Sequence, residues 1–145
     1  MQNLEKEIEE LLLSFGIKLE FLERWQIERI GNSYWITSKG LKSVNGFNVQ
    51  CKGLRIAEKT KLGLKPTSYG LQFLAPYIKN RVVELSKEEL LSIVKAQPIR
   101  KNCDDGYIAV SFGGHIIGCA LAKQRMIYSQ FPKVLAIAIS EANFL

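Results

Sequence analysis

Near the C-terminus, the pair Gly113-Gly114 separates two apolar runs, GYIAVSF and HIIGCALA. A two-residue hairpin turn of the primed type needs a positive φ, which glycine adopts without steric cost. The spacing therefore predicts two antiparallel strands, Tyr107–Phe112 and His115–Ala122, joined by this tight turn. A phosphate loop is disfavoured, because such a loop lies between a strand and a helix N-terminus, and the P-loop type also needs a following Lys-Ser or Lys-Thr.

His115 follows the glycine pair and is the only histidine of the chain. A histidine metal site or proton relay therefore cannot form. Cys119 is expected on the same face of the same strand, about 13 Å away at ~3.3 Å per residue, which is too far for a Cys-His nucleophile pair. No spaced pair of carboxylates indicates hydrolysis or magnesium binding. We expect a structural role for His115, and no enzymatic activity, metal or cofactor.

Cysteine usage and hydropathy indicate a cytoplasmic protein. Cys51, Cys103 and Cys119 are odd in number and show no CxxC spacing, which is typical of reduced cysteines in an intracellular protein. The apolar stretch VLAIAI is too short to cross a bilayer, and the first residues are acidic where a signal peptide needs bases. We expect no membrane partner, and a monomer.

The first half of the chain predicts a helix followed by an antiparallel sheet. Residues 2–14 carry apolar side chains at helical spacing, and Gly16 follows them. The alternating segment that comes next predicts two or three short strands, with a hairpin near Gly31-Asn32 and a further turn at Asn45-Gly46. Ser68 is expected to cap a helix, YGLQFLAPYI, that Pro76 kinks or ends early.

The second half predicts a small barrel. RVVEL is typical of a strand, and Ser86 with Glu89 forms a capping box for a helix. We expect the segment KQRMIYSQFPK to form one loop and Val134–Ile139 to form a last buried strand. The predicted fold class is α+β, with an N-terminal α/β domain containing an antiparallel sheet (residues 1–80) and a C-terminal mixed β-barrel with one helix (residues 81–145).

The charge is unevenly distributed. Residues 1–24 hold six acidic side chains against three basic ones, a balance of −3, whereas residues 39–81 hold nine bases against Glu58 alone, a balance of +8. The net charge of +6 therefore comes from a basic block beside an acidic one. Such a block is typical of a polyanion-binding surface, and equally of lysines on solvated strands and loops.

The candidate binding residues crowd between two predicted strands. Basic groups with an aromatic ring and amides suit RNA, because they serve phosphates, stacking and base edges respectively. The alternative is a solvated loop whose Tyr128 and Phe131 cover the end of the barrel. The candidates are Lys123, Gln124, Arg125, Tyr128 and Lys133, together with Arg100 and Lys101 at an earlier strand entry.

The half from Arg81 onward resembles a PUA domain, the RNA-binding module named for pseudouridine synthases and archaeosine transglycosylases. The resemblance lies in the strand GYIAVSF, the turn GGH, the strand IIGCALA and the basic loop ending in FPK. Upstream, YWITSKGLKS, GLRIAEKTK and above all LQFLAPYIKNRVVE resemble the Nip-seven family of large ribosomal subunit biogenesis factors, of the archaeal type.

This resemblance implies a non-enzymatic role in pre-rRNA processing and large-subunit assembly. It implies RNA binding by the PUA domain, with a preference for uridine- or AU-rich sequence, and Lys123, Arg125 and Lys133 match the basic patch by position. The pre-ribosomal particle or processing proteins would dock on the N-terminal domain. Two alternatives remain open: a PUA module that serves an RNA-modifying enzyme such as a methyltransferase, and a protein-interaction adaptor. Whether the basic block Lys52–Lys65 shares the RNA is also open.

Overall fold

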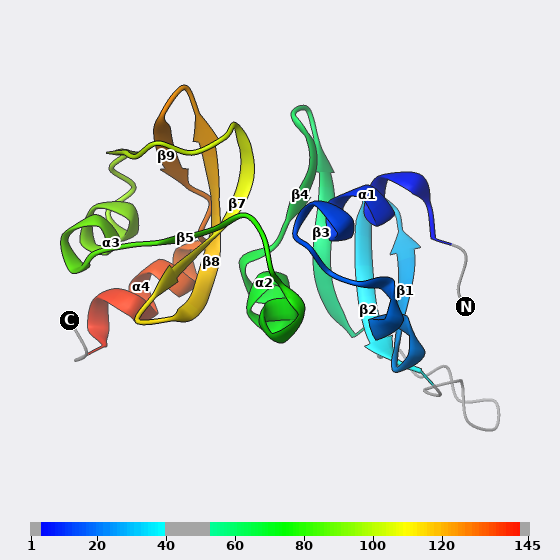
Figure 1. Ribbon diagram of the computed structural model, residues 1–145. Helices are drawn as coiled ribbons and strands as arrows, with labels where there is room; N and C mark the ends of the chain where they lie inside the picture. Colours follow the sequence, from blue (N-terminus) through cyan, green and yellow to red (C-terminus); the bar gives the residue numbers. More distant parts are fainter. Residues whose placement is uncertain (1–3, 40–52, 143–145) are drawn as a thin grey trace.

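The computed structural model describes residues 4–39 and 53–142 and is a mixed α+β fold built on two sheets (Figure 1). Sheet A is antiparallel, with the order β1 (Trp25–Ile30), β2 (Ser33–Ser38), β3 (Leu54–Thr60), β4 (Gly63–Pro66). Sheet B is a curled half-barrel with the order β5 (Val82–Glu84), β7 (Gly106–Phe112), β8 (His115–Lys123), β9 (Met126–Ser129), β6 (Ile99–Arg100). In sheet B, β5 pairs with β7 in parallel, whereas the β7–β8, β8–β9 and β9–β6 pairs are antiparallel.

The helices cover these sheets. The helices are α1 (Lys6–Ser14), α2 (Ser68–Leu74), α3 (Lys87–Val94) and α4 (Lys133–Glu141), with 3-10 helices η1 (Leu19–Glu23) and η2 (Ala75–Tyr77). The predicted first helix is confirmed as α1, and Gly16 follows its C-terminus with a φ of 73°. The hairpin at Gly31-Asn32 is also confirmed. The predicted turn at Asn45-Gly46 lies outside the described residues.

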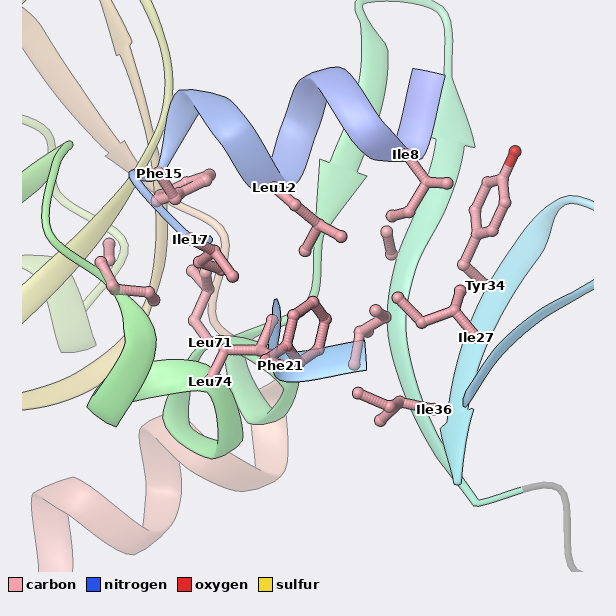
Figure 2. Close-up of a cluster of buried hydrophobic side chains, with 14 of the residues drawn as sticks. Ile8, Leu12, Phe15, Ile17, Phe21, Ile27, Tyr34, Ile36, Leu71 and Leu74 are labelled. Atoms are coloured by element: carbon pink, nitrogen blue, oxygen red, sulfur yellow. The ribbon is translucent and has the colours of Figure 1, made fainter. Parts of the chain in front are cut away.

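The first hydrophobic core lies between α1, α2 and sheet A (Figure 2). Ile8 and Leu12 project from α1 towards Ile27 and Ile36 of the sheet, at the spacing that the amphipathic pattern predicts. Leu71 closes the core from α2. The same core takes in Ala109 and Cys119 of sheet B, so the two sheets share buried surface.

Helix α2 packs against both sheets, through β3 and β8. Its N-cap is Thr67, whose hydroxyl accepts from Gly70 N at 2.9 Å, so the prediction that Ser68 caps this helix is wrong by one residue. Ser68 instead turns its hydroxyl to β8, where Oγ accepts a hydrogen bond from Cys119 N at 2.9 Å. The early end at Pro76 is confirmed, since the α-helix stops at Leu74 and continues as a 3-10 turn.

The second core lies on the concave side of sheet B, under α3 and α4. The capping box of α3 is confirmed: Ser86 Oγ accepts from Glu89 N at 3.2 Å, and Ser86 N donates to Glu89 Oε1 at 2.8 Å. The glycine turn between β7 and β8 is confirmed as well, with φ values of 59° and 81° at Gly113 and Gly114.

The last predicted strand, Val134–Ile139, is wrong, because this run lies within the helix α4. Leu135 and Ile139, four residues apart, are buried, whereas Val134 and Ile137 are 71% and 48% exposed. That burial follows a helical period, which six apolar residues in a row conceal. The C-terminal half therefore carries two helices beside its half-barrel, where one was expected.

The segment KQRMIYSQFPK is not one loop, as predicted, but contains the strand β9. β8 turns back at Gln124-Arg125, which adopt positive φ values of 52° and 65°. The turn was missed because neither residue is the glycine, asparagine or aspartate that normally marks it.

A polar network fastens α1 to sheet A. The hydroxyl of the buried Tyr34 lies 2.7 Å from Glu5 Oε2 and 2.5 Å from Glu7 Oε1. Arg29 and Lys59 each hold one of these carboxylates at 3.1 Å. The Tyr34 hydrogen bond, and then the Lys59 charge, lower the pKa of Glu7 below its ordinary value.

We expect Tyr34→Phe to lower the free energy of unfolding at pH 7 by about 1–3 kcal/mol, since it removes a hydrogen bond to a charged acceptor. Because the pKa of Glu7 is lowered in the folded state, its stabilisation is present above its unfolded pKa and is lost as pH falls through the folded value. The variant should therefore lose less stability than the wild type between about pH 5 and 3. Urea denaturation at several pH values measures both effects. Tyr77→Phe is the control, and an equal acid sensitivity of Tyr34→Phe and wild type would contradict the linkage.

Candidate nucleic-acid interface

The outer face of sheet B is the side turned away from the second core. Ala122 of β8, Ile127 of β9 and Ile99 of β6 are buried in that core. Successive side chains of a strand point to opposite faces, so their neighbours Lys123, Met126 and Arg100 lie on the outer face. Lys123 and Arg100 both pair with Met126 and thus flank it in one row across three strands.

An aromatic row lies beside this basic row. Tyr107 of β7 pairs with Leu121 of β8, which pairs with Tyr128 of β9. These residues share the outer face with Lys123, because Leu121 and Lys123 are two apart on one strand. Tyr128 is 40% exposed, so its ring is open to a ligand on this face.

The β8–β9 turn carries two of the candidate residues in a strained backbone. Residues other than glycine cost about 1–3 kcal/mol in the left-handed region, and Gln124 and Arg125 both adopt it. Two hydrogen bonds hold the turn: Gln124 N donates to Asp105 Oδ1 at 3.0 Å, and Lys101 N donates to Arg125 O at 3.0 Å. The side chains of both turn residues are exposed.

The structure brings most of the candidates together. Lys123, Gln124, Arg125 and Arg100 gather at one end of β8 and β9, and Tyr128 follows two residues after Met126. Within residues 4–39 and 53–142, none of the three basic side chains forms an ion pair. Their charges are therefore available to an anion, and the acidic group Asp105 contacts the turn through the Gln124 amide.

Two candidates lie elsewhere. Lys133 is the first residue of α4, beyond the far end of β9 and about 13 Å or more along the chain from the turn (Figure 1). Lys101 is engaged by other groups of the protein, because its ammonium donates to Glu89 Oε1 at 2.8 Å and to Glu84 O at 3.0 Å. Lys101 thus ties β6 to the capping box of α3, and its charge is neutralised there.

The glycine turn at the opposite end of β8 binds a carboxylate of the protein itself. Glu84 accepts hydrogen bonds from Gly113 N at 2.8 Å, Gly114 N at 3.2 Å and Ser111 Oγ at 2.7 Å. The Ser111 hydrogen bond is the main cause that lowers the pKa of Glu84, so this group is an anion at neutral pH. The two amides are occupied by Glu84 and are not free to hold a phosphate.

The expected common face of His115 and Cys119 is wrong, because β8 contains a bulge. The register against β7 shifts between Ile116 and Gly118, so Ile116 and Cys119 both pack in the first core although they are three residues apart. His115 consequently points to the other face. Burial raises the pKa of the Cys119 thiol to about 12, so this thiol is protonated at neutral pH and is a poor nucleophile.

Neither a scan against models of protein families nor a search of curated proteins finds a match to this chain. Across the described ranges, no group of three histidine, cysteine, aspartate or glutamate side chains is placed to hold a metal ion. Cys103 and Cys119 are free thiols. In the same ranges, no helix is long and apolar enough to cross a membrane.

We expect Arg125→Gly to raise the free energy of unfolding by about 1 kcal/mol, because glycine relieves the strain at a φ of 65° while it adds entropy to the unfolded chain. Arg125→Ala removes the same charge and keeps the strain, so it serves as the matched control. Thermal and urea unfolding of the two variants measure the difference. Equal stability of the glycine and alanine variants would show that the turn is unstrained.

Proposed function

We propose that this protein is a non-enzymatic RNA-binding factor that holds single-stranded RNA on the outer face of sheet B. One observation carries the proposal: basic side chains that form no ion pair with the described residues lie in the row next to an exposed tyrosine, at one end of the outer face of sheet B. Bases of a single strand can stack on such a ring, while the flanking cations neutralise phosphates.

Each candidate has a distinct part in this proposal. Lys123, Arg125 and Arg100 contact phosphates, since they are exposed at one end of the sheet and form no ion pair with the described residues. Tyr128 offers a stacking surface, and the Gln124 side chain reaches a base edge from the turn. Lys101 acts indirectly, because its backbone amide holds the carbonyl of Arg125. Lys133 contacts the RNA only if the bound RNA strand continues towards α4.

The biological process proposed for this activity is pre-rRNA processing and large ribosomal subunit assembly in the cytoplasm. This part rests on the resemblance of LQFLAPYIKNRVVE and of the C-terminal strands to the Nip-seven family and its PUA domain. A curled half-barrel is compatible with a PUA-like domain, and the 80/81 domain boundary remains a prediction. The partners would be a uridine- or AU-rich pre-rRNA and, through the N-terminal half, the pre-ribosomal particle.

We expect Lys123→Ala combined with Arg125→Ala to weaken binding of a uridine-rich oligonucleotide at least about fivefold, since two phosphate contacts are lost. The melting temperature should not fall, because both side chains are exposed and make no ion pair with the described residues. Lys87→Ala with Lys95→Ala removes the same charge from α3 and should leave binding nearly unchanged. Fluorescence anisotropy measures the affinity. Equal affinity of the first double variant and wild type would contradict the assignment of Lys123 and Arg125 as RNA contacts.

The salt dependence gives a second measure of the same contacts. Three phosphate contacts on a single strand predict a slope of log K against log salt of about −2, at ~0.7 per contact. The Lys123→Ala and Arg125→Ala double variant should reduce the slope to about −0.7. A slope that stays near its wild-type value in the variant would place the RNA elsewhere on the molecule.

Co-purification tests the proposed process separately from RNA binding. We expect tagged full-length protein to bring down precursor particles of the large ribosomal subunit. Recovery of an RNA-modifying enzyme with tRNA would instead favour a module that serves such an enzyme. Recovery of protein partners that survives nuclease treatment and the loss of Lys123 and Arg125 would favour an adaptor.

A further inference from the structure

We propose that the β3–β4 hairpin extends the RNA site, so that one single strand is bound by both halves of the protein. The RNA strand would run across the outer face of sheet B, past Tyr107, to Lys65 and Lys61. This inference rests on the proposed function and names the part of the ligand path that lies outside sheet B.

A direct contact joins the hairpin to the aromatic row. The hydroxyls of Thr60, at the end of β3, and Tyr107 lie 3.2 Å apart. Thr60 also donates to Gly63 O at 2.7 Å, which fixes the start of the hairpin turn. The row from Tyr128 through Leu121 to Tyr107 therefore continues into sheet A without a break. Figure 1 shows the β3–β4 and β8–β9 hairpins extending in the same direction from the two sheets.

The charges of the basic block Lys52–Lys65 divide between two faces of sheet A; Lys52 itself lies outside the described residues. Lys59 points to the α1 side, where Glu7 binds it at 3.1 Å, and Arg55 pairs with Glu58 at 3.1 Å. Lys65 lies opposite Glu58 in the register and therefore on the other face from Lys59. In the ranges that the structure covers, Lys61 and Lys65 form no ion pair.

Lys65 precedes Ser68 by three residues, and Ser68 Oγ accepts a hydrogen bond from Cys119 N at 2.9 Å, so this end of β4 lies next to β8. The positive charge of Lys65 lowers the pKa of the Cys119 thiol, in opposition to the raising effect of burial. Cys119 lies on β8 two residues before Leu121, on the same face of the sheet but buried in the first core. Lys61 stands at the tip of the hairpin beside Leu62, which is 65% exposed. Lys65 thus lies near the strand that carries Leu121 of the aromatic row, and Lys61 lies at the exposed tip of the β3–β4 hairpin.

The chemistry favours a single strand over a duplex. A duplex buries its base faces in its own stack, and an exposed tyrosine on a sheet can stack only with an unpaired base. The rows cross β6, β9, β8 and β7, about 14 Å at ~4.8 Å per strand, before they reach the hairpin. A short oligonucleotide can therefore occupy sheet B alone, and only a longer one can also reach Lys65 and Lys61.

The test measures affinity of the full-length protein for oligouridylates of increasing length, by anisotropy. We expect Lys61→Ala with Lys65→Ala to weaken binding of a long oligomer, about 12 nucleotides, by about fivefold or more, and to lower its salt slope by about 1.4. Binding of a short oligomer, about 4 nucleotides, should be unchanged. The Lys123→Ala and Arg125→Ala variant should weaken both.

Lys18→Ala with Lys79→Ala is the matched control, because it removes two exposed lysines of the N-terminal half beside η1 and η2. Melting temperatures show whether the variants are folded. If the Lys61 and Lys65 variant binds the long oligomer like wild type, or loses affinity equally at both lengths, the extended path is wrong while the sheet B site stands. If wild type binds neither oligomer, the proposed function itself fails and this inference falls with it.

Discussion

The arrangement of the two sheets depends on how closely α2 approaches both of them. On one side, Thr67 Oγ1 donates to Arg55 O of β3 at 2.6 Å. On the other side, Gln72 Nε2 donates to Ile117 O of β8 at 2.8 Å, beside the Ser68 contact with Cys119. Gly70 permits this approach, since a Cβ there would lie 2.7 Å from Ile56 Cα. Helix α2 therefore sets how β3 and β8 lie relative to each other.

The connection between the halves reinforces that placement. Lys79 N and Asn80 N both donate to Phe15 O, at 2.9 and 3.0 Å, which ties the connection to the end of α1. Arg81 then adopts a φ of 62°, and its Nε donates to Tyr107 O at 2.9 Å. Because the chain is held on both sides of the junction, Tyr107 stays beside the β3–β4 hairpin. The composite surface proposed for RNA needs this fixed relation.

Sequence patterns predicted elements well where local signals were strong. The capping box at Ser86, the glycine pair at 113–114 and the spacing of Ile8 and Leu12 each specify one local geometry, and each was confirmed. Sequence patterns gave wrong predictions where the local signals were ambiguous or absent. The apolar run of α4 shows no period until burial separates Leu135 from Ile137, and the turn at Gln124-Arg125 lacks a turn residue.

The candidate site could be predicted only in part, because tertiary contacts decide which charges are free. Arg100 and Lys101 are neighbours of the same charge, yet the structure exposes the first and pairs the second with Glu89. Tyr107 gave no signal in the sequence as part of a binding face, since its position depends on the register of β7 against β8 and on the Thr60 contact.

The hydrogen bonds of α2 to β8 also have a consequence for synthesis of the chain. Ser68 and its partner Cys119 are 51 residues apart, and Gln72 and Ile117 are 45 apart. When α2 is made, the strand that completes its polar contacts has not yet been translated, and the apolar side of α2 that faces β8 is still uncovered. The N-terminal half must therefore wait for β8 before its buried surface closes, so the two halves gain their final stability together.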